Sequence, residues 1–192
     1  MSDEQNLAAQ LAEDLDGHFE AFVRTYQDRM YAFALRLSGS RQDAEDAIQD
    51  AFVRAYRALE RYPPERRREL HLRAWLYQIV LNVVRNRVRR QTPVLVPIDV
   101  PVEDTLAGVA ADEPEAVAIR GEVRGWLGAA IAGLPPRYGT ALVLRHVQGL
   151  SYAEAAEILD QPIGTTKSDV HRGLRLLRRA LEPELLAEAR AN

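Results

Sequence analysis

The sequence contains no cysteine. This absence excludes a disulfide-stapled scaffold, a thiolate zinc site and a cysteine nucleophile, and it gives no indication of an oxidising compartment. The chain also has no apolar run approaching the roughly 18 residues of a membrane span. Its first 17 residues are acidic and lack the basic start and apolar core of a signal peptide. We therefore expect a cytoplasmic protein.

Common catalytic motifs are missing as well. There is no glycine-rich phosphate loop and no G-x-S-x-G sequence. The four histidines are scattered without metal-ligand spacing. We expect no cofactor, no metal and no catalytic site of the chain's own. The 192 residues, of which 47% are hydrophobic, suffice for one domain or two small ones.

The net charge of −3 hides a segregation of charge along the chain. Residues 1–60 carry −6, residues 61–90 carry +7, residues 91–119 carry −6 and residues 120–192 carry +2. Blocks of this size indicate separate surfaces for separate partners, although solvated helix faces would give the same pattern.

Helical periodicity dominates the sequence. Apolar residues recur every three or four positions in the segments 19–37, 44–59, 72–83, 119–133, 138–147, 152–159 and 170–181. Residues 91–116 contain four prolines among acidic and small residues without that period, as a linker does. We predict an all-α fold with two small helical domains, residues 18–90 and 118–182, joined by an extended acidic linker, residues 91–117. Residues 1–17 and 183–192 are expected to be tails.

Residues 151–181 carry the clearest local pattern. Ser151 and Glu154 form an S-x-x-E capping box, and Thr165 is expected to cap the last helix after a tight turn. Two capped helices joined in this way are typical of a helix-turn-helix. Its expected inward positions are Ala155, Ala156, Ile158, Ile163, Val170 and Leu174. With five bases and one acid in residues 161–181, the second helix can contact base edges and phosphates, whereas a plain helical hairpin would only expose a basic face.

Residues 75–90 form a second basic, amphipathic segment. Asn82 and Asn86 lie one turn apart beside Arg85 and Arg89. Asparagine is a poor helix former, which favours a role for these side chains outside the helix itself. Aromatic residues beside arginines suit single-stranded DNA, whose bases stack and whose phosphates pair with guanidinium groups. For Trp75 a place in the core is the favoured alternative.

An acidic face is expected at residues 43–50, where Asp43, Asp46 and Asp50 follow helical spacing. Clustered carboxylates could hold magnesium as in a metal-dependent nuclease, provided that they converge in a cleft. A protein-docking surface is the favoured interpretation, and a solvated helix face is the simplest one.

Together these segments resemble the group 4, or extracytoplasmic-function, sigma factors of bacterial RNA polymerase. The stretch FEAFVRTYQDRMYAFALRLSGSRQDAEDAIQDAFVRAYRAL is similar to the first half of the sigma-2 domain, and LRAWLYQIVLNVVRNRVRR to its promoter-melting half. The stretch from LPPRYG to RRAL, residues 134–181, is similar to the sigma-4 domain. The resemblance covers about residues 18–90 and 119–181. The chain has no room between them for the extra helical domain of larger sigma factors.

The resemblance implies a role for each segment. The acidic face would dock on the β′ clamp of core polymerase through Asp43, Glu45, Asp46, Gln49 and Asp50. The segment 72–90 would recognise and melt the −10 element through Arg73, Trp75, Tyr77, Asn82, Arg85, Asn86, Arg89 and Arg90. The loop near residues 62–70 would capture a flipped base. The last helix would read the −35 duplex through Thr165, Lys167, Ser168, His171, Arg172 and Arg175.

Three residues depart from the family's usual pattern. Thr166 stands at a commonly apolar, buried position, where its hydroxyl needs a partner. Asp169 stands where many members have arginine, and near DNA it would either weaken phosphate binding or accept a hydrogen bond from cytosine. Asp160 replaces a frequent turn glycine, which aspartate can do.

The prediction is a non-enzymatic promoter-specificity subunit that directs core polymerase to promoters and starts DNA melting. Its expected partners are the polymerase β′ clamp and β flap, duplex −35 DNA, single-stranded −10 DNA and an anti-sigma factor. In holoenzyme it would be associated with the nucleoid. A free-standing helix-turn-helix regulator is the alternative, but such a regulator needs neither the acidic face nor the segment 75–90.

Overall fold

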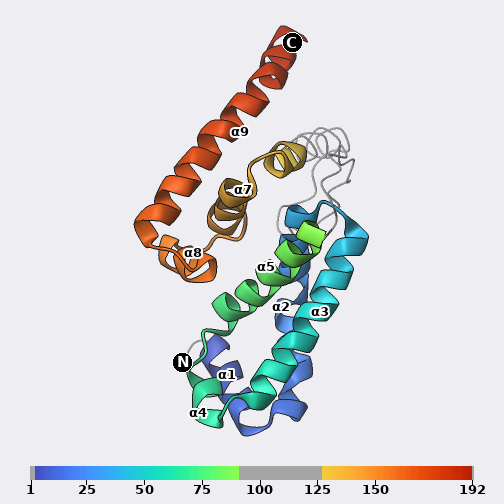
Figure 1. Cartoon of the computed structure of the whole chain (residues 1–192), viewed down its shortest axis with the longest axis vertical. Coiled ribbons are helices and arrows are strands. Elements are labelled where there is room, and N and C mark those ends of the chain that lie inside the picture. Colours follow the sequence, from blue (N-terminus) through green and yellow to red (C-terminus); the bar gives the residue numbers. More distant parts are fainter. Residues whose placement is uncertain (1–2, 91–126, 192) are drawn as a thin grey trace, which may run out of the picture. The chain divides into compact units, whose positions relative to one another are not determined.

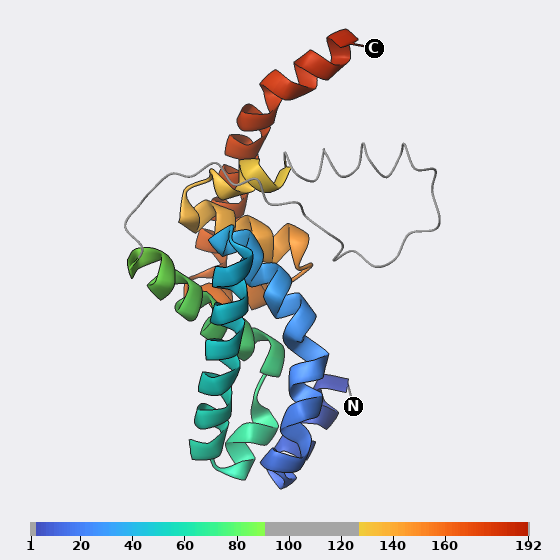
Figure 2. The same ribbon diagram turned by 90° about the vertical axis from the view of Figure 1, so that its right-hand side faces the viewer.

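The computed structural model describes residues 3–90 and 127–191, with side chains described for residues 3–87 and 127–182. The chain divides into two compact units, Met1–Val94 and Leu95–Asn192. Within the described residues both units consist of helices and turns without a strand (Figures 1 and 2). The predicted linker, residues 91–117, lies outside the described residues.

The described part of the first unit, residues 3–90, contains five helices: α1 (Asp3–Glu13), α2 (Leu15–Ser38), α3 (Arg41–Arg61), α4 (Pro64–Glu69) and α5 (Leu72–Arg90). Local caps explain several of their boundaries. The Asp14 carboxylate accepts a hydrogen bond from the Gly17 amide at 3.0 Å and caps α2. Gly39 ends α2 with a φ of 68°. The Ser40 hydroxyl caps α3 by accepting from the Asp43 amide at 3.3 Å.

The core of the first unit is formed where α5 packs against α2 and α3. Along α5 one broad side is buried, and its members are Leu72, Ala74, Leu76, Tyr77, Val80, Leu81, Val83 and Val84. Phe33 of α2 meets Tyr77 edge to face, with ring centroids 5.0 Å apart. The burial of so much apolar surface fixes the rotation of α5 about its own axis, and therefore which of its side chains face solvent.

Residues 1–17, which the sequence analysis treats as a tail, contain a helix that belongs to the core. In α1 the side chains of Leu7, Ala8, Leu11 and Ala12 are buried, and the helix packs against α4, α2 and α5 at one end of the unit (Figure 1). The Glu4 carboxylate accepts a hydrogen bond from the Arg73 amide at 2.8 Å, where α5 begins. The first domain therefore begins well before residue 18.

The described part of the second unit starts with a helical stretch at residues 127–132. It continues with α7 (Pro136–Leu142), the π-helical segment η1 (Val143–Val147), α8 (Tyr152–Leu159) and α9 (Ile163–Ala191). Gly149 follows η1 with a φ of 68°, the left-handed conformation in which glycine commonly ends a helix. The predicted capping box of α8 is confirmed, with the Ser151 amide donating to the Glu154 carboxylate at 2.8 Å.

Three predictions for the last helix are corrected. The helix begins at Ile163 rather than after Thr165, because the Thr166 amide donates to the Pro162 carbonyl at 3.0 Å. Ile163 and Leu174, predicted as inward residues, are 46% and 39% exposed. The buried face of α9 consists instead of Thr166, Asp169, Val170, Gly173 and Leu177.

None of the helices in the described ranges is both long and apolar enough to cross a bilayer.

The packing of α1 generates the first testable prediction. Leu11 has no exposed surface, so Leu11→Ala should lower the free energy of unfolding by about 2–5 kcal/mol, as truncation of a buried leucine does. Asn6→Ala, on the exposed side of the same helix, is the matched control and should stay within about 0.5 kcal/mol. Denaturant unfolding of the full chain measures both. Equal stability of the two variants would contradict the assignment of α1 to the core.

Candidate nucleic-acid interface

The solvent face of α5 carries amides and arginines. Asn82, Arg85 and Asn86 are exposed and lie on one side of the helix. Trp75, Gln78 and Ile79 are half-buried and extend that side toward the start of α5. The sequence of α5 contains five arginines and no acidic residue, so this face can approach phosphates without like-charge repulsion. The predicted residues Arg89 and Arg90 lie beyond the described side chains.

Tyr77, which the sequence analysis placed on the DNA face, is 1% exposed and belongs to the core. Trp75 and Tyr77 are two positions apart, which places them about 200° apart around a helix. Since Trp75 lies on the exposed side, Tyr77 points into the bundle. Tyr77 is therefore withdrawn from the candidate DNA-binding residues.

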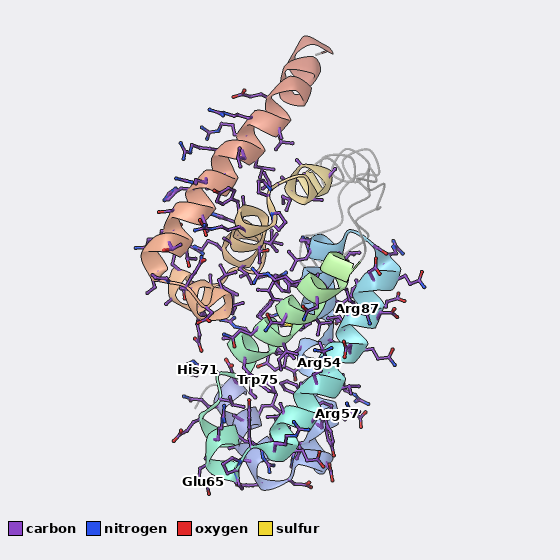
Figure 3. All side chains as sticks on the ribbon, viewed as in Figure 1. Arg54, Arg57, Glu65, His71, Trp75 and Arg87 are labelled. Carbon is purple, nitrogen blue, oxygen red and sulfur yellow. The ribbon has the colours of Figure 1, made fainter. Side chains whose placement is uncertain are left out.

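An aromatic and cationic corner lies beside the start of α5. The rings of Tyr62 and Trp75 are 6.2 Å apart between centroids, and the Arg66 guanidinium lies 3.8 Å from the centroid of Tyr62. Figure 3 shows Trp75 and His71 at this end of α5. The corner offers flat apolar faces next to positive charge, which is the chemistry that holds an unstacked base.

Helix α4 has no buried side chain of its own, and Arg67 ties it to its neighbours. The Arg67 guanidinium donates to the Tyr62 carbonyl at 3.0 Å and to the Leu11 carbonyl at 2.9 Å. These carbonyls lie at the C-terminal ends of α3 and α1, where backbone acceptors lack helical partners. Sequence reasoning missed this role of Arg67, because nothing local distinguishes it from Arg66 and Arg68.

The acidic face of α3 is present, and two of its carboxylates are paired. Glu45, Asp46 and Gln49 are exposed, whereas Asp43 and Asp50 are half-buried. Arg54 makes two hydrogen bonds to Asp50, at 2.8 and 2.9 Å. Arg87 reaches from α5 to the Asp46 carboxylate at 3.2 Å (Figure 3). Solvent-exposed pairs of this kind contribute little stability, so both carboxylates can exchange these partners for others.

The nuclease alternative requires the carboxylates to converge. Across residues 3–87 and 127–182, no group of three or more acidic or histidine side chains is arranged to hold a metal ion. Asp46 and Asp50 instead lie along one helix surface, beside arginines. The acidic face therefore runs openly along one helix, and its role as a docking surface stays a prediction.

Helix α9 presents its polar residues outward. Lys167, Ser168, His171, Arg172 and Arg175 are exposed, and Thr165 is half-buried. The Lys167 ammonium lies 5.7 Å from the centroid of the Tyr152 ring on α8. The predicted −35 residues are thus brought to one solvent face of a helix-turn-helix, and their roles toward DNA stay predictions.

A polar network around the buried side chains of Thr166 and Asp169 holds α9 in place. Arg137 of α7 donates to Asp169 at 2.7 Å, and the Gln161 amide donates to Thr166 at 3.0 Å and to Asp169 at 3.2 Å. The Thr166 hydroxyl also donates to the Pro162 carbonyl at 3.3 Å, so it has the partners that its burial requires. Hydrogen bonding to Asp169 raises the pKa of the Arg137 guanidinium. The hypothesis that Asp169 contacts DNA is wrong, because its side chain is 3% exposed and faces α7.

The prediction that Asp160 can replace a turn glycine is confirmed, since Asp160 adopts the left-handed conformation with a φ of 50°.

Comparison with known families agrees with this geometry. The model described as Sigma-70 region 2 matches residues 22–94, and that described as Sigma-70, region 4 matches residues 124–177.

Curated relatives match over most of the chain. SigW of Bacillus subtilis, an ECF RNA polymerase sigma factor, is 33% identical over 174 residues, covering 85% of this chain and 88% of SigW. The RNA polymerase sigma-H factor of Pseudomonas aeruginosa is 33% identical over 177 residues, covering 89% of each. SigE of Mycolicibacterium smegmatis is 35% identical over 166 residues, which span 83% of this chain but 60% of SigE.

Two solved structures share the fold. CnrH, solved with the cytosolic domain of CnrY, has a TM-score of 0.69 and 22% identity, covering 95% of this chain and 99% of CnrH. RpoE of Bartonella quintana, solved with the anti-sigma factor NepR, has a TM-score of 0.66 and 24% identity, covering 85% of this chain and 96% of RpoE.

The buried network in α9 yields a testable prediction. Asp169→Ala should lower the free energy of unfolding of the second unit by about 1–3 kcal/mol, because the half-buried amide of Gln161 loses an acceptor. Arg137→Ala should cost less, since the Arg137 side chain is 60% exposed and can be hydrated. Denaturant unfolding of the two single variants and the double variant measures the coupling. Additive effects in the double variant would contradict a direct interaction.

Proposed function

Because the chain belongs to the extracytoplasmic-function group of the sigma-70 family of RNA polymerase sigma factors, we propose that its two units divide promoter recognition and melting between them. The first unit docks on the polymerase clamp and holds the melted −10 strand. The second unit binds the −35 duplex and the β flap. The chain acts in the cytoplasm as a specificity subunit and adds no catalytic site to the polymerase.

One observation carries the assignment of the first unit: its docking face and its DNA face point in different directions. Arg87 faces α3. Asn82 and Arg85 are about 140° and 160° away from Arg87 around α5, at 3.6 residues per turn. A polymerase surface on the acids of α3 therefore leaves the exposed side of α5 open to DNA. Both partners can bind one small bundle at the same time.

The chemistry of each face matches its partner. The face of α3 presents Glu45, Asp46 and Gln49 to solvent, which suits a basic protein surface and steers association through opposite charge. The face of α5 offers amide groups for base edges and guanidinium groups for phosphates, and Trp75 and Tyr62 offer stacking surfaces. Melting is stabilised because these contacts form with unpaired bases only.

The exposed side of α9 supports the proposed −35 contact. Its first turns carry Lys167, Ser168 and His171, small or basic side chains that fit base edges in a major groove. Arg172 and Arg175 come next along α9, and their long side chains can reach phosphates. The buried network around Asp169 positions this helix on α7 and so supports the contact without touching DNA.

We also propose control by an anti-sigma factor. CnrH and RpoE share this fold and were each solved with a partner, in the case of RpoE one named as an anti-sigma factor. In this chain, Ile163 and Leu174 leave apolar surface exposed on the second unit. Such surface is a candidate contact for a protein that holds the chain away from polymerase.

The docking proposal is tested by reversing charge on α3. Asp46→Arg should weaken binding to core RNA polymerase by more than about tenfold, because like charges meet across the interface. Glu60→Arg makes the same change in charge at an exposed position on the same helix and should leave binding near the wild-type value. Gel filtration with core polymerase and a titration by fluorescence anisotropy measure both. Equal weakening by the two variants would show a general charge effect and contradict the docking face.

The melting proposal is tested on the exposed amides of α5. Asn82→Ala combined with Asn86→Ala should lower the amount of open complex about tenfold, since two hydrogen bonds to unpaired bases are lost. Polymerase binding should change little. Permanganate reactivity of promoter thymines reports melting, and Gln27→Ala, an exposed amide on α2, is the control. A parallel loss of polymerase affinity and melting would assign the two asparagines to the protein interface instead.

A further inference from the structure

The second unit contains a groove that neither the sequence pattern nor the family assignment accounts for. Tyr138 of α7 and four residues of α9, Arg172, Arg175, Leu176 and Arg179, line a hollow of about 250 Å³. Three of these five side chains are arginines, and none is acidic. Arg172 and Arg175 are predicted −35 residues, whereas Tyr138, Leu176 and Arg179 have no assigned role.

The groove exists because α7 and α9 approach closely at Gly173. A Cβ atom at this position would lie 3.0 Å from the Tyr138 carbonyl oxygen and 3.3 Å from a methyl group of Leu142. A side chain at position 173 would push the two helices apart by a few tenths of an ångström, so glycine favours their packing at this distance. The close approach sets the Tyr138 ring beside Arg172, whose guanidinium donates to the phenol oxygen at 3.2 Å. With its oxygen accepting from Arg172, the phenol keeps its own hydrogen to donate to a ligand.

The electrostatics of the groove favour an anion. Arg172, Arg175 and Arg179 are exposed and follow one another along one side of α9, at spacings of three and four residues. In the described part of the chain no carboxylate pairs with any of the three guanidinium groups, in contrast to Arg137, which is paired with Asp169. Planar guanidinium groups bind phosphate oxygens in pairs, so three of them around a hydroxyl donor form a suitable phosphate cradle.

We propose that this groove binds a backbone phosphate at the border of the −35 duplex. This proposal rests on the proposed −35 function of the second unit. The distance along α9 supports the placement. Ser168 and Arg179 are eleven positions apart, or about 16 Å of helix, whereas the major groove is about 12 Å wide. When the first turns of α9 lie on base edges, Arg179 stands beyond the base pairs, at the level of the sugar–phosphate backbone.

Continuity with the −35 residues favours DNA over an acidic protein segment as the ligand. Arg172 and Arg175 line both the groove and the predicted DNA face, so one strand can run from one to the other without a break. Leu176 is the one aliphatic residue among the five that line the groove, which leaves little apolar surface for an amphipathic peptide. The groove thereby adds affinity without adding sequence preference.

The test compares two adjacent arginines in holoenzyme reconstituted from the full chain and core polymerase. The probe is a duplex selected by that holoenzyme from a random library, together with versions altered at its −35 bases. Arg179→Ala should weaken binding roughly three- to tenfold, equally for every −35 sequence, and reduce the slope of log affinity against log salt by about 1. Arg178→Ala is the matched control, since Arg178 is exposed next to Arg179 but does not line the groove. It should cause the smaller loss.

A chemical change in the DNA locates the contact. A neutral methylphosphonate is placed at one backbone position at a time around the −35 element. At one position it should weaken wild-type binding by the same factor as Arg179→Ala, and the two changes together should weaken it no further. Tyr138→Phe, which removes the phenol donor but keeps the ring, should give a smaller loss with the same positional dependence.

The possible failures are distinguishable. If the wild-type chain shows no −35 preference, the proposed −35 function fails and the groove proposal with it. If the preference is present but Arg179→Ala and Arg178→Ala behave alike, or methylphosphonate effects add to Arg179→Ala at every position, the groove proposal alone is overturned. A loss of polymerase affinity in Arg179→Ala with unchanged DNA affinity would overturn it in favour of an acidic protein ligand.

Discussion

The arrangement of the first unit depends on how α5 is buried. Eight of its side chains lie in the core against α2 and α3, among them Tyr77 in edge contact with Phe33. This burial fixes the rotation of α5, because any turn about its axis would bring apolar surface into water and place Asn82 or Arg85 in the core at a large desolvation cost. The helix must therefore present the side that carries Asn82 and Arg85 to solvent. The same constraint directs Arg87 toward α3 and its acidic face.

Several arginines in the described part of the chain fall into two groups with different physical roles. Arg67, Arg87 and Arg137 face acceptors on neighbouring helices, where they complete helix ends or pair with carboxylates. Arg85 on α5, and Arg172, Arg175 and Arg179 on α9, have exposed side chains. The first group holds the scaffold, and the second leaves concentrated positive charge available for phosphates. A net charge of −3 is compatible with DNA binding because the acids are placed elsewhere.

The sequence predicted those features that local chemistry determines and missed those that arise from packing. The Ser151–Glu154 box sets the start of α8 through contacts only three residues apart, so the sequence pattern predicted it. Helix α1 was not predicted because two of its four buried side chains are alanines and two of its three partners, α4 and α5, are remote in sequence. Ile163 and Leu174 were expected inside because hydrophobic periodicity cannot detect a buried face built from Thr166, Asp169 and Gly173. Among the site residues, Tyr77 could have been excluded from its angle to Trp75, whereas Arg67, Arg87 and the groove at Tyr138 required coordinates.

The central claim is that one small bundle binds polymerase through α3 and DNA through α5 at the same time. Site-specific photocrosslinking tests it most directly, with a benzoylphenylalanine at Gln49 or at Asn82 in the complete complex of the chain, core polymerase and promoter DNA. Both positions are exposed, so either can carry the probe. The account predicts that the probe at position 49 crosslinks to a polymerase subunit and the probe at position 82 to the non-template strand. Crosslinking of position 82 to polymerase, or of position 49 to DNA, would contradict it.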